Sequence, residues 1–496
     1  MAAPGPQPLR MGTSSGRWVL LATVLGSSMA MLDSTVVNVA LERIGRDLGG
    51  GFSGLQWTVN AYALTLASLI LLGGSLGDRF GRRRVFVTGV VWFALASLIC
   101  GIAPNIEALV AARALQGVGG ALLTPGSLAI ISASFRPGDR AAAVGAWSGL
   151  GGLGAAIGPF LGGWLVEWSW RLVFLINLPL AALVIVVALR HVPETRDPQA
   201  VPGLDVSGTA LAVLGLAALT WSLTGIGGGA TPALLAALAV GLLGLAALVL
   251  VERRSRHPLI PTELFVNPVF TAANVVTLLI YGALGVVFVL LVLQLQTVSG
   301  FTPLQAGAAL LPITVIMLLF SARVGALAQR LGPRLPLAVG SLIGATGLLL
   351  MRRIGPGSTW LADVLPAVGV FGAGLALIVA PLTATVLDAA AERHAGAASG
   401  VNNAVARAAG LLAVAVIPGL AGITGASYSD PATFDPGFRT AMLIGAGLLV
   451  AAAAIAFAAL RVSFGGEPPA QRLPIERCAH CGVNAPQLHP DDRGSA

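Results

Sequence analysis

One acidic residue lies near the middle of a long apolar segment. Of the 21 acidic residues in the chain, Asp33 alone takes such a position, in the run that reads Met31-Leu-Asp33-Ser-Thr-Val-Val-Asn38. A charge within an apolar span is costly and by default marks a functional site, for which proton binding is one chemistry. A structural carboxylate that is bonded to neighbouring helices is the alternative interpretation.

Arg113 is a second charge inside an apolar run, and Gln116 follows it by one helical turn. Asp33 lies eight residues, or about 12 Å, from Leu41 at the end of its run, and Arg113 lies seven residues, or roughly 10 Å, from Ile106 at the start of its run. If the two runs cross a membrane in opposite directions, these similar distances place the two charges at the same depth. Because an unpaired buried charge is far costlier than a paired one, we expect direct or water-bridged contact. An arginine satisfied by backbone carbonyls is the alternative.

The composition indicates that a membrane surrounds most of the chain. Charged residues make up 10% of the 496 residues and hydrophobic residues 56%, and the mean hydropathy is +0.87. Soluble globular proteins have roughly 25% charged residues. No stretch has the polarity of a soluble domain, and the longest strongly polar segment is 462–496. The sequence therefore predicts a membrane protein.

Fourteen runs are long enough to cross the roughly 30 Å of hydrocarbon, which takes about 20 apolar residues. They lie at about 18–41, 55–76, 85–104, 106–134, 141–166, 171–190, 205–226, 231–251, 269–293, 304–327, 335–351, 361–387, 396–425 and 437–461. We therefore expect an all-α membrane protein of 14 transmembrane helices. The first run follows a short N-terminal segment without a cleavage site, so we interpret it as a retained span.

The distribution of arginine predicts the orientation. All 29 basic residues are arginine; 20 lie in one set of loops with both tails, six lie in the other set, and Arg113, Arg323 and Arg407 fall inside spans. Positively charged loops are cytoplasmic, so we expect both termini in the cytoplasm. A chain without lysine that is rich in alanine and glycine suggests a GC-rich bacterial genome, so we expect the cytoplasmic (inner) membrane of a bacterium. The high pI of about 10.7 could suggest nucleic acid. These arginines sit in short loops between apolar runs, however, so we expect no nucleic-acid partner.

An internal repeat predicts how the spans are grouped. The segment Gly74–Arg83 realigns on Gly325–Arg334 at an offset of 251 residues, with Gly, Leu, Arg, Gly and Arg in common. The two copies are eight spans apart, although two six-helix halves alone would separate them by six. We therefore expect a 6 + 2 + 6 arrangement. Its parts are a cytoplasmic tail (1–17), a six-helix bundle (18–190), an inserted helix pair (205–252), a second six-helix bundle (269–461) and a cytoplasmic tail (462–496).

The first copy of the repeat combines glycines, one acid and four arginines in the loop Gly74 to Arg84. GSLGDRFGRRR resembles the signature loop of the major facilitator superfamily. The resemblance implies a gating loop, whose residues here are Gly74, Asp78, Arg79, Gly81, Arg82 and Arg83. An aspartate beside a helix N-terminus is stabilised by roughly 0.3–1 kcal/mol or more. We expect Asp78 to dock near Ala398 to Gly400 when the cavity faces outward. A plain topology anchor is the alternative.

The fifth run is rich in glycine. It carries Gly145, Gly154, Gly158, Pro159, Gly162 and Gly163. At 100° per residue, Gly151, Gly154, Gly158 and Gly162 fall within about 80° of one face, which permits close helix approach. Pro159 removes one backbone hydrogen bond and permits a bend. Ordinary tight packing is one interpretation, but the spacing resembles the antiporter motif of drug exporters in that superfamily.

Further segments extend the resemblance along the chain. LDSTVVNVAL, from Leu32 to Leu41, is similar to the span-1 motif of the fourteen-span drug:proton antiporter family, which usually continues with Pro where Glu42 stands here. The fourth run is similar to the family's arginine-containing motif. Other matching segments begin at Gln56, Trp170, His257, Gly300 and Ala398, the last of which is followed by Arg407.

The resemblance implies two bundles that export hydrophobic drugs or antibiotics in exchange for protons by alternating access. Asp33 and Arg113 would then serve proton coupling, and Asn38 and Gln116 would join them in proton coupling or substrate binding. Asp78 and Arg79 would serve gating. Uptake and lipid movement are alternatives within transport. A membrane glycosyltransferase would need a polar catalytic loop, commonly acidic, on the outside, but the outer loops are short. A receptor would need an extramembrane recognition module, which the sequence lacks.

The cargo is expected to be a neutral or monocationic hydrophobic small molecule, because a dication would face only one available carboxylate. No acid lies in the tenth run, from Leu304 to Leu327. We expect no cofactor and no metal. The tail has Cys478, His480 and Cys481, but a single CxxC without a second pair is weak support for zinc, and a disordered tail is the preferred interpretation.

Overall fold

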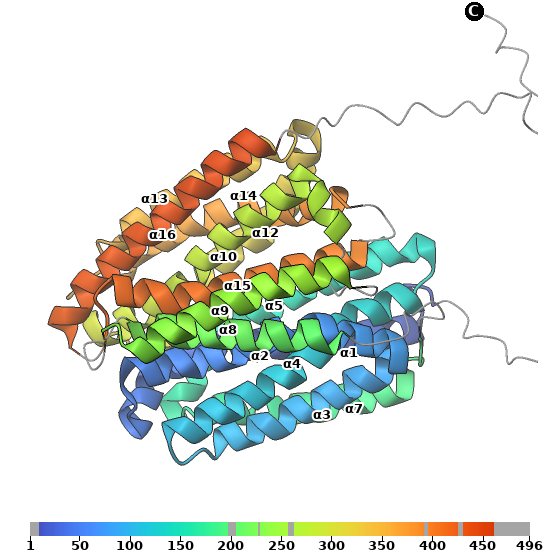
Figure 1. Cartoon of the computed structure of the whole chain (residues 1–496), viewed down its shortest axis with the longest axis horizontal. Coiled ribbons are helices and arrows are strands. Elements are labelled where there is room, and N and C mark those ends of the chain that lie inside the picture. The colour runs from blue at the N-terminus through green and yellow to red at the C-terminus, as the bar shows by residue number, and fades with distance from the viewer. Residues whose placement is uncertain are drawn as a thin grey trace, which may run out of the picture. The chain divides into compact units, whose positions relative to one another are not determined.

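A computed structural model describes residues 9–196, 205–226, 229–255, 262–390, 395–424 and 430–460, which all belong to the unit from Met1 to Arg461. These residues are almost entirely helical. They contain no β-strand, only an isolated bridge between Leu9 and Phe135. The expected all-α fold is therefore confirmed (Figure 1). The tail that was expected at 462–496 lies outside the described residues.

The first half of the chain forms six helical spans. They are α1 (Ser14–Leu48), α2 (Gly51–Phe80), α3 (Arg82–Gly101), α4 (Ile106–Ser134), α5 (Pro137–Trp168), and the short α6 (Leu172–Leu175) followed by α7 (Asn177–His191). Two helices come next, α8 (Val206–Ile226) and α9 (Pro232–Arg254). These eight spans correspond one by one to the first eight predicted runs.

The second half also forms six spans. They are preceded by a 3-10 turn, η1 (Thr262–Val266). They comprise α10 (Pro268–Leu293) with the π-helical turn η2 (Gln294–Val298), α11 (Pro303–Ala308) with α12 (Leu311–Leu331), α13 (Arg334–Met351), the π-helical turn η3 (Trp360–Val364) with α14 (Leu365–Asp388), α15 (Ala395–Leu420) and α16 (Pro431–Ala459). Thirteen helical segments of the described residues are long and apolar enough to cross a membrane. The remaining predicted span is α5, whose 32 residues include nine glycines.

The helices continue past the apolar runs that predicted them. α1 extends to Leu48, and α2 extends to Phe80, so the expected loop from Gly74 to Arg84 is almost entirely helical. Only Gly81 interrupts it, with a φ of 114°, a conformation that favours glycine. Gly332, 251 residues later, has a φ of 80° between α12 and α13. The sequence repeat is therefore also a repeat of backbone conformation.

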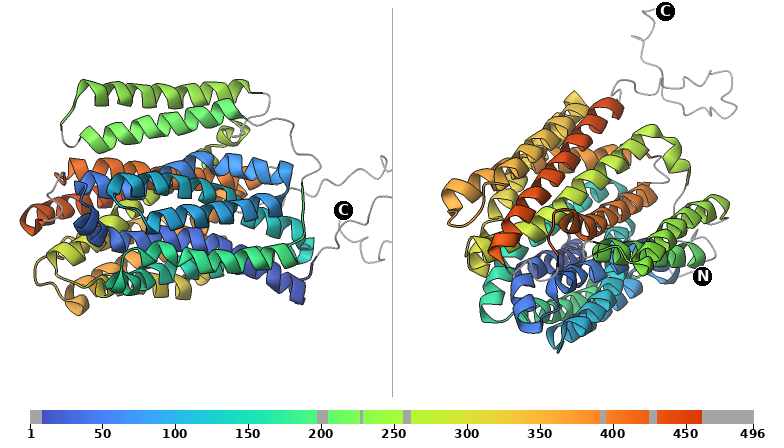
Figure 2. Two further views of the ribbon diagram at one scale, coloured as in Figure 1. Left: turned by 90° about the horizontal axis from the view of Figure 1, so that it is seen from below. Right: turned by 60° about the vertical axis from the view of Figure 1, so that its left-hand side comes forward.

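Helix contacts follow the 6 + 2 + 6 order. In the first bundle α1 packs against α4, α5 and α7, and α4 packs against α2 and α3. In the second, α13 packs against α14 and α16, while α10 packs against α15 and α16. The inserted helices α8 and α9 lie side by side at the edge of the helical core, and α8 contacts α2 and α15 (Figures 1 and 2). The insertion therefore touches one helix of each bundle.

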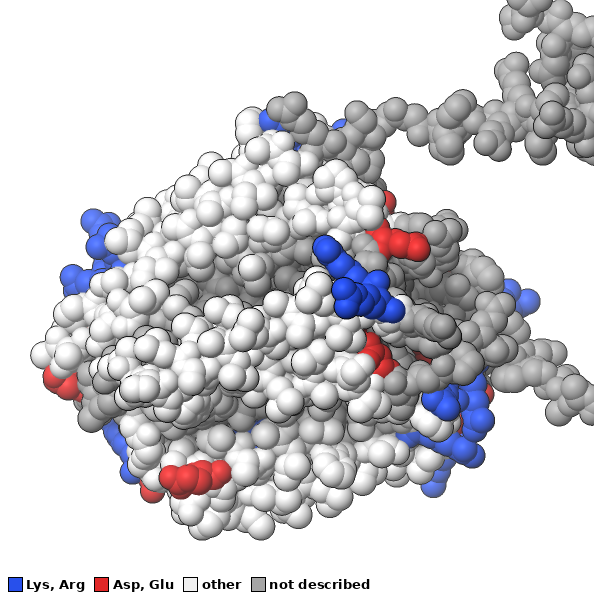
Figure 3. All heavy atoms as spheres, viewed as in Figure 1, with Lys and Arg blue, Asp and Glu red and all other residues white. Residues whose placement is uncertain are grey.

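The two bundles meet through α2 with α15 and through α5 with α11. Two side-chain amides add polar links: Gln56 Nε2 donates to the Val414 carbonyl at 2.7 Å, and Gln296 Nε2 donates to the Val39 carbonyl at 3.0 Å. Charged side chains lie mainly toward the ends of the helices, with a largely uncharged surface between them (Figure 3). The end that carries Arg82–Arg84 and Arg136 is called the arginine-rich end below.

Candidate transport site

Asp33 and Arg113 form a buried ion pair inside the first bundle. Arg113 Nη1 lies 2.5 Å from Asp33 Oδ2, and the two side chains are 1% and 0% exposed. They come from α1 and α4, which run in opposite directions and place the charges at one depth. The expected contact is therefore confirmed, and it is direct.

Three further side chains complete a network around the carboxylate. Gln116 Nε2 and Asn177 Nδ2 both donate to Asp33 Oδ1, at 2.8 and 3.1 Å. The same two amides donate to Ser97 Oγ, which donates in turn to the Phe174 carbonyl at 2.9 Å. Helices α1, α3, α4 and α7 thus converge on one acid. Sequence reasoning had placed Gln116 here but had missed Ser97 and Asn177.

The Arg113 guanidinium is also held on its other sides. Its Nε donates to the Thr58 carbonyl at 3.0 Å, and its Nη1 donates to Gln116 Oε1 at 2.7 Å. Its carbon lies 4.3 Å from the centre of the Tyr62 ring, a cation–π contact. Both charges are thus neutralised and hydrogen-bonded, and removal of one partner would leave a buried charge uncompensated.

A cavity of about 430 Å³ lies between the two bundles. Its wall comes from α1 and α2 on one side and from α10, α14 and α15 on the other. Met31, Ser34, Thr35 and Asn38 are the residues of α1 in this wall. The volume is within the roughly 300–1,000 Å³ range of small-molecule sites. The cavity is therefore the candidate cargo site.

The structure separates Asn38 from the residues with which it was grouped. Asp33, Arg113 and Gln116 form the buried network, whereas Asn38 lines the cavity. Five residues along a helix turn the side chain by about 140°, which carries Asn38 toward a different face from Asp33. α1 therefore presents the ion pair on one face and the cavity wall on another. The expected role of these four residues in proton coupling or substrate binding stays a prediction.

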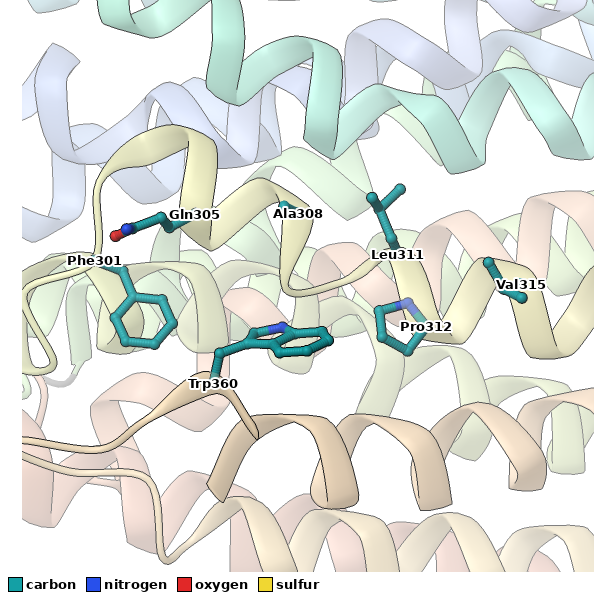
Figure 4. A pocket seen from close by; sticks show the side chains of 7 residues that line it. All are labelled: Phe301, Gln305, Ala308, Leu311, Pro312, Val315 and Trp360. Atoms are coloured by element: carbon teal, nitrogen blue, oxygen red, sulfur yellow. The ribbon is translucent and has the colours of Figure 1, made fainter. Parts of the chain in front are cut away.

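A larger hollow of about 750 Å³ lies among α11, α12 and η3 (Figure 4), and neither Asp33 nor Arg113 lines it. Phe301, Leu311, Pro312 and Trp360 make its lining mainly apolar, and no charged residue is among its described lining residues. Its one amide side chain, Gln305, already accepts from the Thr302 N–H in the cap of α11. We therefore favour the smaller cavity between the bundles as the cargo site.

The predicted gating residues form a compact junction between α2 and α3. The Asp78 carboxylate pairs with Arg82 at 2.8 Å, and Glu194 accepts from the Arg83 and Arg84 N–H groups at 3.1 and 3.2 Å. A Cβ at Gly81 would lie 2.6 Å from Glu194 Oε1. Glu194, which the sequence did not single out, therefore caps α3. Docking of Asp78 on α15 stays a prediction.

The motif glycines of α5 fall into three groups, and the surroundings of Gly151 lie outside the described part of the structure. Gly154 and Gly158 leave no room for a Cβ beside Ser28 and Thr35 of α1, and Gly162 lies tightly against Val36. Gly163 faces the other bundle, where a Cβ would lie 2.5 Å from the Pro303 carbonyl oxygen, and the Pro159 backbone similarly meets Gly307 of α11. Nothing lies within 4 Å of a Cβ at Gly145. The expected close packing is thus found at every position of this motif except Gly145.

No cluster of three potential metal ligands occurs in the described part of the chain. Cys478, His480 and Cys481 lie outside the described residues, so their expected lack of a metal role stays a prediction.

Comparison with solved structures agrees with this architecture. A crystal structure of peptide transporter POT in complex with sulfate covers 92% of this chain and 98% of its own, with a TM-score of 0.65 and 16% identity. A bacterial homologue of the human lysosomal transporter Spinster, in its inward-facing and unoccupied conformation, gives a TM-score of 0.61 at 19% identity and covers 91% and 98%. At these identities the likeness concerns the fold alone.

Sequence relatives are resistance and export proteins. The puromycin resistance protein pur8 of Streptomyces alboniger is 35% identical over 472 residues, which cover 92% of each chain. The tetracenomycin C resistance and export protein of Streptomyces glaucescens is 35% identical over 406 residues, covering 80% of this chain and 74% of the relative. The family model of the Major Facilitator Superfamily matches residues 23–415. The chain therefore belongs to the major facilitator superfamily, among relatives of the drug-exporting kind that its motifs resemble.

Proposed function

We propose that this transporter exports hydrophobic small molecules from a bacterial cytoplasm in exchange for protons, by alternating access. The observation that carries the proposal is the sealed Asp33–Arg113 pair, on a helix that also lines the cavity between the bundles. A buried acid near the middle of a membrane span is a natural proton site. The relatives named for antibiotic resistance and export support outward transport of drug-like cargo.

The coupling step follows from the two faces of α1. A proton that binds Asp33 removes the negative charge that holds Arg113, while Arg113 keeps its bonds to Gln116 and the Thr58 carbonyl. α1 is then held less tightly against α4. Because Ser34 and Thr35, next to Asp33, line the cavity, a shift of α1 changes the cargo site. Proton binding and cargo binding therefore both act on α1.

Rocking of the two bundles supplies the access change. We propose that residues 18–190 and 269–461 are the two moving bundles. Residues 205–252 are the helix pair that is inserted between them in the sequence. The arginine-rich end faces the cytoplasm under this proposal, so both termini are cytoplasmic in the inner membrane. Asp78 and Arg79 govern closure at that end. The α5 contacts of Gly163 with Pro303 close the opposite end.

The cargo expectation changes in one respect. The monocationic alternative rested on Asp33 as an available carboxylate, but Arg113 neutralises this acid and the side chain does not line the cavity. We retain hydrophobic small-molecule cargo and no longer favour cations.

The exchange of Asp33→Asn is expected to abolish pH-gradient-driven efflux from proteoliposomes, because an amide cannot bind and release the proton. Cargo counterflow without a gradient should persist, since it needs no proton exchange and every residue of the cavity wall is retained. Glu107→Gln removes the charge of an exposed acid at the start of α4 and should preserve both activities. Retained pH-driven efflux in the Asp33→Asn variant would refute coupling through this residue.

A further inference from the structure

The wall of the central cavity contains polar groups that the protein itself does not satisfy. Asn60 is 0% exposed, yet neither Nδ2 nor Oδ1 has a hydrogen-bond partner. Asn38 is 9% exposed, and its Oδ1 is likewise unpartnered. Both line the cavity, from α2 and α1. Because a buried amide without partners costs about 1–3 kcal/mol, these side chains are arranged for something that enters the cavity.

A charged group faces them from the other bundle. Arg407 of α15 is the one charged residue in the described cavity wall. No acidic side chain of the described residues lies within ion-pair distance of Arg407, in contrast to Arg113, which Asp33 neutralises. A guanidinium presents several N–H donors in a planar fork that suits a carboxylate. Among the described residues, the cavity wall therefore carries one positive charge that no acidic side chain neutralises.

The rest of the wall is largely apolar. Val59, Leu284, Phe288 and Leu411 contribute hydrophobic side chains from α2, α10 and α15. An apolar lining with a few convergent polar groups is the usual composition of a small-molecule site, in which the polar groups fix orientation. Here the polar groups are the Arg407 cation and neutral amides and hydroxyls, among which Asn38 and Asn60 have buried atoms without partners. The complementary molecule is therefore an apolar body with one anionic group.

We propose that the cavity selects hydrophobic monoanions, such as aryl carboxylates, whose anionic group binds Arg407 and whose neighbouring polar atoms bind Asn38 and Asn60. This inference rests on the proposed transport function and specifies its cargo. An anion in the cavity would be held by contacts to both bundles at once, since Arg407 belongs to the second bundle and the two asparagines belong to the first. A neutral ester of the same shape keeps the apolar contacts and loses the charged one.

Equilibrium binding to the purified full-length protein in detergent tests the proposal without any proton gradient. The probes are pyrenebutyric acid, its methyl ester and pyrenebutylamine, which share one apolar body. Hydrogen bonds to charged groups contribute about 1.5–3 kcal/mol, or roughly 10-fold to 100-fold in affinity. The wild-type protein should bind the acid at least about 10-fold more tightly than the ester, and should bind the amine most weakly.

Arg407→Gln should reduce the affinity for the acid to that for the ester, while the affinity for the ester changes less than about twofold. Arg407→Lys should retain part of the preference for the acid over the ester. Arg323→Gln is the matched control, because Arg323 is an exposed arginine of α12 outside the cavity wall. Equal weakening of acid and ester by Arg407→Gln, or tighter binding of the amine than of the acid, would overturn the proposal. If Arg407→Gln does not fold, the wild-type ranking and the Arg407→Lys variant still decide it.

Failure of this inference is distinguishable from failure of the proposed function. Asp33→Asn can change the absolute affinities through α1, but it should keep the preference for the acid over the ester, because Arg407 is retained. Loss of pH-driven efflux with an unchanged anion preference supports both proposals. A preference for the acid without proton coupling supports the cavity proposal alone, and coupling without that preference supports the transport proposal alone.

Discussion

Arg113→Leu is expected to lower the free energy of unfolding by about 3–5 kcal/mol, because it leaves the Asp33 carboxylate buried without its cation. The remaining donors, Gln116 and Asn177, are neutral and cannot replace the charge. Denaturation of the purified protein in detergent measures the loss. Adding Asp33→Asn to the Arg113→Leu variant should restore most of the stability, since no buried charge then remains.

The control for this cycle is Arg323→Leu, which removes an exposed arginine from another helix and should change the free energy of unfolding by less than about 0.5 kcal/mol. If Arg113→Leu alone were as stable as the wild-type protein, the ion pair would not hold α1 against α4. If the double variant were no more stable than Arg113→Leu, the loss would come from packing around Tyr62 rather than from charge.

Gly163→Ala is expected to reduce efflux by at least tenfold while the protein still folds. A Cβ at this position would lie 2.5 Å from the Pro303 carbonyl oxygen and 2.7 Å from the Leu304 Cα. These are backbone atoms that cannot rotate away, so α5 and α11 must separate. Under the proposed cycle, the end opposite the arginine-rich end then cannot close. Efflux from proteoliposomes, with spin-label distances between α5 and α11, measures both effects.

Gly145→Ala is the matched control, in the same helix and the same motif. Nothing lies within 4 Å of a Cβ at Gly145, and alanine favours helix over glycine by about 1 kcal/mol. Gly145→Ala should therefore transport normally and be slightly more stable. Equal loss of efflux in both variants would show that helix flexibility, and not the α5–α11 contact, accounts for the motif.

The ion pair could be predicted from the sequence because charged residues are rare inside the apolar helices, so each of the two had few possible partners of opposite charge. Asp33 and Arg113 stand alone in apolar helices, so a count of residues from each helix end was enough to place them together. Ser97 and Asn177 could not be found in this way, because a hydroxyl or amide in an apolar helix has many possible partners within and between helices. Their roles depend on how α3 and α7 approach α1.

Which residues line the cavity could not be predicted from the sequence either, because it depends on how the helices pack. Asn38 shares a motif with Asp33 yet faces the cavity, and Asn60 carried no motif at all. The 6 + 2 + 6 order was predictable because the repeat fixes the number of intervening spans. The capping role of Glu194 was not, since its contacts with Arg83 and Arg84 join segments 110 or more residues apart.

Proton release on cargo binding tests coupling through Asp33 most directly. Purified protein in weakly buffered detergent solution, near neutral pH, receives saturating cargo while an indicator dye reports the pH. Antiport through Asp33 predicts release of a proton with the bound cargo, and no release in the Asp33→Asn variant, which still binds cargo. Equal release by the wild-type and Asp33→Asn proteins, or cargo binding by the wild-type protein without any release at any pH in its stable range, would contradict it.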